Sequence, residues 1–149
     1  MKRLLFTLTL FLGLSALSLA QDVQVPAYDW AGFERYAADN ASRGGHSPLA
    51  VIMGDSITDG WLAQDPAFFS DNNIAGRGIS GQVTSQMLVR FRQDVIDLHP
   101  AAVVINAGTN DVAENQGPYD ETFTMGNIIS MVELARANGI AVVLTTAMP

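Results

Sequence analysis

An α/β fold built on a parallel sheet is the fold class that this sequence predicts, and two observations predict it. Short, uninterrupted apolar runs recur along the chain at 49–53, 101–105 and 140–144. Segments with the 3.6-residue periodicity of an amphipathic helix separate these runs. Strands that are apolar on both faces and are joined through helices form parallel sheets, and right-handed crossovers then place helices on both faces.

Three helices are expected, each marked by apolar residues on one face. They cover 29–40, 83–98 and 128–135. Asp29 suits the N-cap of the first helix, Pro100 stops the second, and Gly139 ends the third. A weaker strand at 73–75 and a polar loop at 111–120 complete the predicted order.

Residues 1–20 have the form of a secretory signal peptide. Two cations precede an uncharged run at 4–19, and Ser18 and Ala20 are the small residues that flank the expected cleavage position. The run is shorter than the ~20 apolar residues of a membrane-spanning helix. We therefore expect a secreted or periplasmic protein, with its domain at 21–149 and no stable membrane span after cleavage.

The composition excludes several classes of function. The 149-residue chain carries 8 Lys and Arg against 15 Asp and Glu, a formal net charge of −7, whereas nucleic-acid binding needs positive charge. Because there is no cysteine, the chain has no disulfide framework, zinc–thiolate site or thiol nucleophile. The one lysine, Lys2, lies in the predicted signal peptide, so the domain has none for Schiff-base chemistry.

Glycine and polar residues follow three of the predicted strands at the point where each strand ends. These clusters are Gly54–Gly60, Gly76–Gly81 and Ala107–Asp111. The carboxyl ends of parallel strands meet at one edge of the sheet, which is where open α/β sheets bind ligands. The sequence therefore predicts one shared site at that edge.

Ser56 is the main candidate in this site. A serine between a buried strand and a helix exposes its hydroxyl and directs backbone N–H groups outward, as attack on a carbonyl and oxyanion binding require. The alternative is an ordinary N-cap serine. Asn110 and Gly78 are candidate donors to the same oxyanion, and the alternatives for them are an Asx turn and a tight turn.

These residues resemble the SGNH, or GDSL-type, hydrolase family. Its first block matches Gly54-Asp55-Ser56-Ile57, its second matches Gly78, and its third matches Gly108-Thr109-Asn110-Asp111, in the family's order and spacing. The resemblance covers residues 28–149 and implies a three-layer α/β/α, flavodoxin-like fold. It also implies hydrolysis of carboxylic esters, with small-molecule, lipid or carbohydrate esters as substrates and no cofactor.

The resemblance further implies a role for each candidate residue. Ser56 is then the nucleophile, and the N–H groups of Ser56 and Gly78 form the oxyanion hole with the Asn110 side chain. One departure from the family pattern is Gly76, where related sequences commonly have Asn. A second departure is that the family's Asp-x-x-His block, which carries the catalytic Asp and His, does not occur in this chain.

The two histidines of the chain do not replace this block. His46 and His99 precede predicted strands, so we expect both at the amino-terminal edge of the sheet. A five-residue strand at ~3.3 Å per residue separates that edge from Ser56, which is beyond the reach of a general base.

Three aspartates near the predicted site leave alternatives open. Asp55, Asp59 and Asp111 either supply a carboxylate base or bond to turns and helix N-termini. A carboxylate cluster for magnesium is a third alternative, although the resemblance implies no metal.

We therefore expect an exported ester hydrolase that is incomplete at its C-terminus, with its catalytic Asp and His supplied downstream. By itself this chain is expected to show little esterase activity, an exposed apolar sheet edge and poor solubility. The alternative function is a non-catalytic module that binds glycans or small ligands on the same fold. A phosphate or flavin binder is disfavoured because no G-x-x-x-x-G-K-[ST] motif occurs.

Overall fold

A four-stranded parallel sheet forms the centre of the molecule, as predicted. The computed structural model describes residues 29–145, so the predicted signal peptide and residues 146–149 lie outside the described part. The strands are β1 (Ala50–Gly54), β2 (Ile74–Gly78), β3 (Ala102–Ile105) and β4 (Ala141–Leu144). Their order in the sheet is β2-β1-β3-β4, and every pairing is parallel. This order places β1, the strand before Ser56, between β2 and β3.

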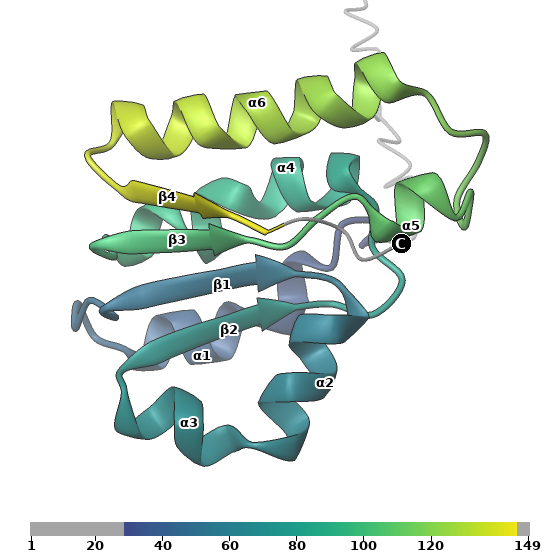
Figure 1. Cartoon of the computed structure of the whole chain (residues 1–149). Coiled ribbons are helices and arrows are strands. Elements are labelled where there is room, and N and C mark those ends of the chain that lie inside the picture. Colours follow the sequence, from purple (N-terminus) through teal and green to yellow (C-terminus); the bar gives the residue numbers. More distant parts are fainter. Residues whose placement is uncertain (1–28, 146–149) are drawn as a thin grey trace, which may run out of the picture.

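Helices connect consecutive strands and flank the sheet. They are η1 (Phe33–Arg35), α1 (Ala37–Ser42), α2 (Ser56–Gln64), α3 (Pro66–Asp71), α4 (Thr84–Asp94), η2 (Ile96–Leu98), α5 (Thr109–Val112) and α6 (Glu121–Ala137). Figure 1 shows the four strands between α6 at the top and α2 and α3 at the bottom. The strand–helix–strand connections are those that a parallel sheet requires.

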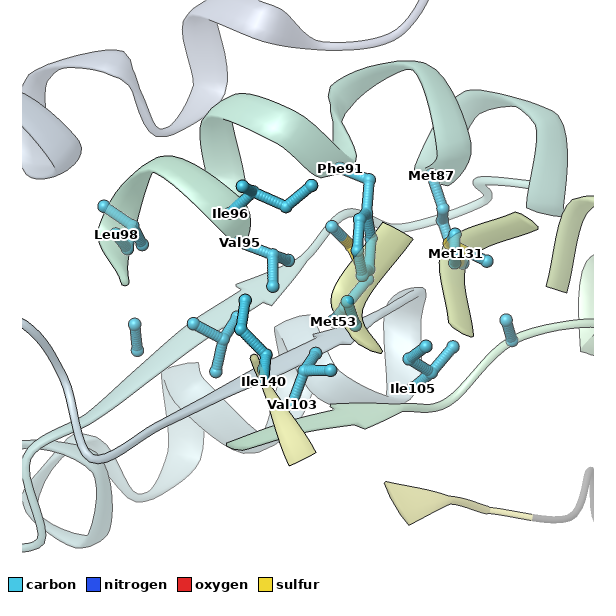
Figure 2. Packing of buried hydrophobic residues seen from close by; sticks show 14 residues of the cluster. Met53, Met87, Phe91, Val95, Ile96, Leu98, Val103, Ile105, Met131 and Ile140 are labelled. Carbon is cyan, nitrogen blue, oxygen red and sulfur yellow. The ribbon is translucent and has the colours of Figure 1, made fainter. Parts of the chain in front are cut away.

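The main hydrophobic core lies between the sheet and helices α4 and α6. Alternate residues of the strands point to this side, so Val51, Met53, Val103 and Ile105 share one face. Helix residues spaced by one turn pack against them, and Figure 2 shows these side chains meeting above the strands. The contributions are Met87 and Phe91 from α4, Val95 directly after it, and Met131 and Ala135 from α6.

The opposite face of the sheet packs against α2 and α3. Gly76 of β2 is directed to this side, where an added Cβ would lie 3.0 Å from Leu62 Cδ2 and 3.1 Å from Phe69 Cε1. A side chain at position 76 would therefore require the Leu62 and Phe69 side chains to shift. This close approach gives a packing reason for the glycine that replaces the commonly found Asn.

The predicted helix at 29–40 is divided in the structure. The Asp29 carboxylate does accept from the N–H groups of Phe33 (2.8 Å) and Glu34 (2.9 Å), as a capping side chain does. However, Gly32 has a left-handed φ of 70°, and only a 3₁₀ turn follows it before α1 begins at Ala37. Periodicity alone predicted one helix because the apolar spacing continues across the break.

The ends of other elements also differ from the predicted ones. The weak strand predicted at 73–75 extends to Gly78, and α3 begins at Pro66, where no helix was expected. The third helix begins at Glu121 rather than 128, because the Asp120 side chain accepts from the N–H groups of its first turn. The loop predicted at 111–120 is shorter, since α5 extends into it.

Candidate active site

Ser56, Gly78 and Asn110 lie at the carboxyl-terminal edge of three adjacent strands. Ser56 follows β1, Gly78 ends β2 and Asn110 follows β3. The first turn of α2 contacts both neighbours. A Cβ at Gly78 would lie 2.2 Å from the Asp59 nitrogen, and the Asn110 Nδ2 lies 3.5 Å from Oδ2 of Asp55. The three clusters therefore converge on one edge of the sheet, as predicted.

Asp55, and not Ser56, is the N-cap of helix α2. The buried Asp55 carboxylate accepts a hydrogen bond from the Ile57 N–H at 2.9 Å. Ser56 is thus the first residue inside the helix, with an exposed side chain. Within residues 29–145, neither its hydroxyl nor its backbone N–H has a hydrogen-bond partner. The positive end of the α2 dipole and an unused N–H group are therefore available beside the hydroxyl.

Gly78 is required by close packing rather than by its backbone dihedral angles. Its φ is not in the left-handed region, but a Cβ would also come within 2.7 Å of Thr58. The Ile79 N–H donates to the Gly54 carbonyl at 3.1 Å, so the backbone groups of Gly78 point away from β1. The Gly78 carbonyl accepts from the Tyr36 hydroxyl. The tight-turn alternative therefore does not explain this glycine.

The Asn110 side chain connects three segments of the chain. Its Nδ2 donates to the Gln82 carbonyl at 2.9 Å, and its Oδ1 accepts from Asn115 Nδ2 at 2.6 Å. With Asp55 Oδ2 at 3.5 Å from the same nitrogen, the buried amide reaches the turn that carries Ser56. These bonds span several segments, so an Asx turn that stabilises only its own loop does not describe Asn110.

The remaining aspartates of the edge have structural partners. Asp59 is partly buried, which raises its pKa, but hydrogen bonds from Ser80 and Arg35 outweigh burial and hold the pKa below its ordinary 3.8. Asp111 accepts from the N–H of Thr84 at 3.0 Å and from its hydroxyl at 2.6 Å, and so caps α4 from another segment. Among residues 29–145, no group of three or more His, Asp or Glu side chains is placed to hold a metal ion.

Both histidines lie at the other edge of the sheet. His46 is located between α1 and β1, and His99 between η2 and β3, so each precedes a strand. Both side chains are exposed, and the His99 backbone has a left-handed φ of 51° at the end of η2. Neither histidine is placed to accept the Ser56 proton, as the sequence predicted.

A buried arginine behind the site was not predicted from the sequence. Arg90 of α4 donates to the carbonyls of Gly54 (3.2 Å) and Arg77 (2.9 Å), which lie at the ends of β1 and β2. It also donates to Gln82 Oε1 at 2.7 Å and Asp94 Oδ2 at 2.9 Å. Burial lowers the pKa of Arg90, and the hydrogen bond to Asp94 opposes that shift. The i, i+4 spacing of Arg90 and Asp94 was a sequence signal for this pair.

Arg77 supports the same region from the side of α1. Its guanidinium donates to Asn40 Oδ1 at 3.0 Å and pairs with the Asp39 carboxylate. It also lies over the Tyr36 ring, 4.7 Å from the centroid, and Tyr36 bonds to the Gly78 carbonyl. The strand end that carries Gly78 is therefore held by α1 as well as by α4.

Two apolar clefts border the candidate site. One, of ≈ 330 Å³, lies on the α2 side of the sheet and includes Ile57 and Trp61. The other, of ≈ 370 Å³, lies beside α5 and α6 and includes Gly108 and Val112. Ile57 adjoins Ser56 and Gly108 lies near Asn110 in sequence, so each cleft has lining residues next to the candidate site. In the described part of the chain, no helix has the length and apolar character to cross a membrane.

Comparison with known proteins agrees with this geometry. Residues 52–149 match the model of the GDSL-like Lipase/Acylhydrolase family. A GDSL-like lipase from Bacteroides thetaiotaomicron VPI-5482 is 54% identical, with a TM-score of 0.74, over 80% of this chain and 60% of that one. A solved protein from Bacteroides fragilis NCTC 9343 is 56% identical, with a TM-score of 0.76, over 80% of this chain and 59% of that one.

A relative known from sequence is more distant. The uncharacterized lipoprotein YqeF of Bacillus subtilis (strain 168) is 34% identical over 80 residues, which are 52% of this chain and 33% of that protein. The chain thus spans a third of this relative and about three fifths of the two solved proteins. The family match and the parallel α/β fold together establish that the chain belongs to the GDSL-like lipase/acylhydrolase family.

Proposed function

We propose that Ser56 is the nucleophile of a carboxylic ester hydrolase. The N–H group of Ser56 and the Nδ2 of Asn110 then bind the oxyanion, and Gly78, whose backbone groups point away from β1, contributes through its close packing against the first turn of α2. The observation that carries the proposal is the start of α2: Asp55 caps the helix, which leaves the Ser56 hydroxyl exposed and its N–H without a partner in the described residues. Attack by Oγ on an ester carbonyl would develop negative charge next to the positive end of this helix.

The base that removes the Ser56 proton is proposed to come from outside residues 29–145. His46 and His99 lie at the opposite edge of the sheet, and the solved relatives are longer than this chain. We propose an Asp-x-x-His segment as the source, with the histidine accepting the Oγ proton and returning it to the leaving alcohol. Water would then hydrolyse the acyl-enzyme.

The substrate class proposed for this site is an acyl or acetyl ester of a lipid or a carbohydrate. The apolar clefts beside Ser56 and Asn110 suit the carbon chain of such an ester. The excess of acidic residues disfavours strongly anionic substrates. We further propose that residues 1–20 direct the protein out of the cytoplasm.

Chemical rescue with imidazole tests the proposal on the 149-residue chain itself. Without a base, the chain should hydrolyse p-nitrophenyl acetate slowly, and added imidazole should raise the rate above that of imidazole alone. Ser56→Ala should abolish this increase, and Asn110→Ala should lower it by roughly 10²-fold because an oxyanion donor is lost. A fluorophosphonate probe should label the wild-type chain and not Ser56→Ala.

Ser130→Ala is the matched control for this experiment. Ser130 is a serine of α6 whose hydroxyl donates to the Gly126 carbonyl at 2.8 Å, away from the site. Its loss should change neither the rescue nor the labelling. Equal rescue and labelling in the wild type and Ser56→Ala would contradict the proposed nucleophile and favour a binding module on the same fold.

A further inference from the structure

We propose that Asn115 is a positioning residue that holds the Asn110 carboxamide in the orientation an oxyanion donor needs, an inference that rests on the proposed function. Asn115 lies in the connection between α5 and α6. Its Nδ2 donates to Asn110 Oδ1 at 2.6 Å, and its backbone N–H donates to the Asn110 carbonyl at 3.1 Å. Both contacts of Asn115 are therefore with the residue that is proposed to bind the oxyanion.

An asparagine carboxamide has two orientations of nearly the same shape, and only one presents N–H groups to the site. The Gln82 carbonyl lies 2.9 Å from Asn110 Nδ2, and a backbone carbonyl only accepts. The Gln82 carbonyl therefore disfavours the orientation in which Asn110 Oδ1 would face it. Asn115 provides the complementary donor for Oδ1, so two contacts from different segments select the same orientation.

Burial makes the donor from Asn115 necessary. Asn110 is only 7% exposed, so its Oδ1 would be a buried, unsatisfied acceptor without that donor. Donation to Oδ1 also polarises the amide and strengthens the hydrogen bonds that its nitrogen donates.

The Asn110 nitrogen keeps one hydrogen for the reaction. Gln82 takes one of its two hydrogens, and among residues 29–145 the other faces only Asp55 Oδ2 at 3.5 Å, at the limit of a hydrogen bond. That hydrogen is the one we assign to the oxyanion that forms on the ester carbonyl oxygen when Ser56 Oγ attacks.

Side-chain exchange in the whole 149-residue chain tests the orientation without any activity. The Asn110 amide pair in a ¹⁵N spectrum is identified by its loss in Asn110→Ala. Asn115→Ala should speed exchange of this pair with solvent several-fold and bring its two proton shifts closer together. Asn115 is exposed, so this change opens no buried cavity. An Asn110 pair that is unchanged in Asn115→Ala would overturn the proposal.

Asn138→Ala is the matched control. Asn138 is also exposed, and its Nδ2 also donates to a single carbonyl, that of Leu134 at 2.8 Å, but it lies at the end of α6 before β4. Its loss should leave the Asn110 amide pair unchanged. A change as large as that in Asn115→Ala would also overturn the proposal, because the effect would then report general loosening.

Imidazole-rescued hydrolysis supplies a second readout. Asn115→Ala should lower the Ser56-dependent kcat roughly tenfold with KM unchanged, because the lost contact acts on the transition state. Asn115→Asp should lower it further, since a carboxylate cannot donate to Oδ1. The double variant Asn110→Ala/Asn115→Ala should be no slower than Asn110→Ala, because Asn115 acts through Asn110.

The outcomes separate this inference from the proposed nucleophile. Losses that multiply in the double variant would indicate a merely structural role and overturn the positioning role. Full rescue in Ser56→Ala would contradict the proposed function, and the amide exchange would still decide the orientation. Rescue that requires Ser56 and Asn110 but is unchanged in Asn115→Ala would overturn the positioning inference alone.

Discussion

The two faces of the sheet are covered to very different extents. Toward α4 and α6, Val51, Met53 and Val103 are completely buried. On the opposite face, α2 and α3 contact mainly β2 and β1, and a cleft of ≈ 330 Å³ lies beside Val104. Further along that face, Val143 of the edge strand β4 is 53% exposed.

This difference shows which helix supports the candidate site. Arg90 reaches the carbonyls of Gly54 and Arg77 from the covered face, so α4 contributes to the core and also holds the strand end before Ser56. The face toward α2 and α3 instead presents apolar side chains of α2, such as Trp61, in a cleft near the candidate site. The face toward α4 and α6 therefore contributes both to stability and to the geometry of the candidate site.

Among the changes that test this comparison, removal of the buried Arg90 charge should have the largest effect on the free energy of unfolding. Arg90→Met deletes four hydrogen bonds and leaves Asp94 buried without its partner, which should lower the free energy of unfolding by roughly 3–5 kcal/mol. Urea denaturation followed by circular dichroism measures the loss. The double variant Arg90→Met/Asp94→Leu should recover part of it, because no unpaired charge then remains.

A loss below about 1 kcal/mol in Arg90→Met would contradict a supporting role for this residue. The same urea titration on Arg92→Met provides the matched control. Arg92 belongs to the same helix but is exposed, and in residues 29–145 its side chain makes no hydrogen bond or ion pair. Its substitution should change the free energy of unfolding by less than about 0.5 kcal/mol.

A matched pair of valines compares the two faces directly. Val103→Thr places a hydroxyl in the core between the sheet and α4 and α6. It should lower the free energy of unfolding by about 1–3 kcal/mol, because the buried hydroxyl loses its hydrogen bonds to water. Val143→Thr makes the same chemical change on the open face and should cost less than about 0.5 kcal/mol. It should also raise the solubility of the chain, measured by precipitation with polyethylene glycol. Equal costs at the two positions would show that the faces are equally well packed.

The smallest effect is expected at the rim of the covered face, where Asp39 pairs with Arg77 and Arg43. Burial raises the pKa of Asp39, but hydrogen bonds and charge from the two arginines outweigh it and hold the pKa below the ordinary 3.8. Since the folded pKa is the lower one, this carboxylate stabilises the fold above pH 3.8, and the contribution disappears as the pH falls through the folded pKa.

Asp39→Asn should therefore lower the free energy of unfolding at pH 7 by at most about 1 kcal/mol, because the carboxylate is half exposed. The difference in the free energy of unfolding between the variant and the wild type should narrow as the pH falls below the unfolded pKa of this carboxyl. Urea titrations at pH 7 and at pH 3 measure both values. Asp59 is unchanged in both proteins, so its own lowered pKa cancels from the difference. A difference in the free energy of unfolding that stays constant with pH would contradict the ion-pair explanation.

Much of the fold and of the site could be predicted because both follow from local patterns. Apolar runs identified the strands, and polar residues at their ends identified the edge that brings Ser56 and Asn110 together. The predicted helix at 29–40 failed at Gly32, whose left-handed backbone interrupts an apolar spacing that continues past it. The sequence did not predict α3 because its residues, 66–71, include no helical stripe that stands apart from the neighbouring turns.

The sequence by itself determined the parallel sheet, the position of Ser56 directly after a buried strand, and the placement of both histidines before strands. Only the tertiary structure decided that Asp111 caps α4, that Arg90 bonds to the carbonyls before the Ser56 turn, and that Asn110 meets Asp55 across 55 positions of the chain. The physical reason is range: periodicity records what each segment buries, whereas a hydrogen bond between distant segments depends on how those segments pack together.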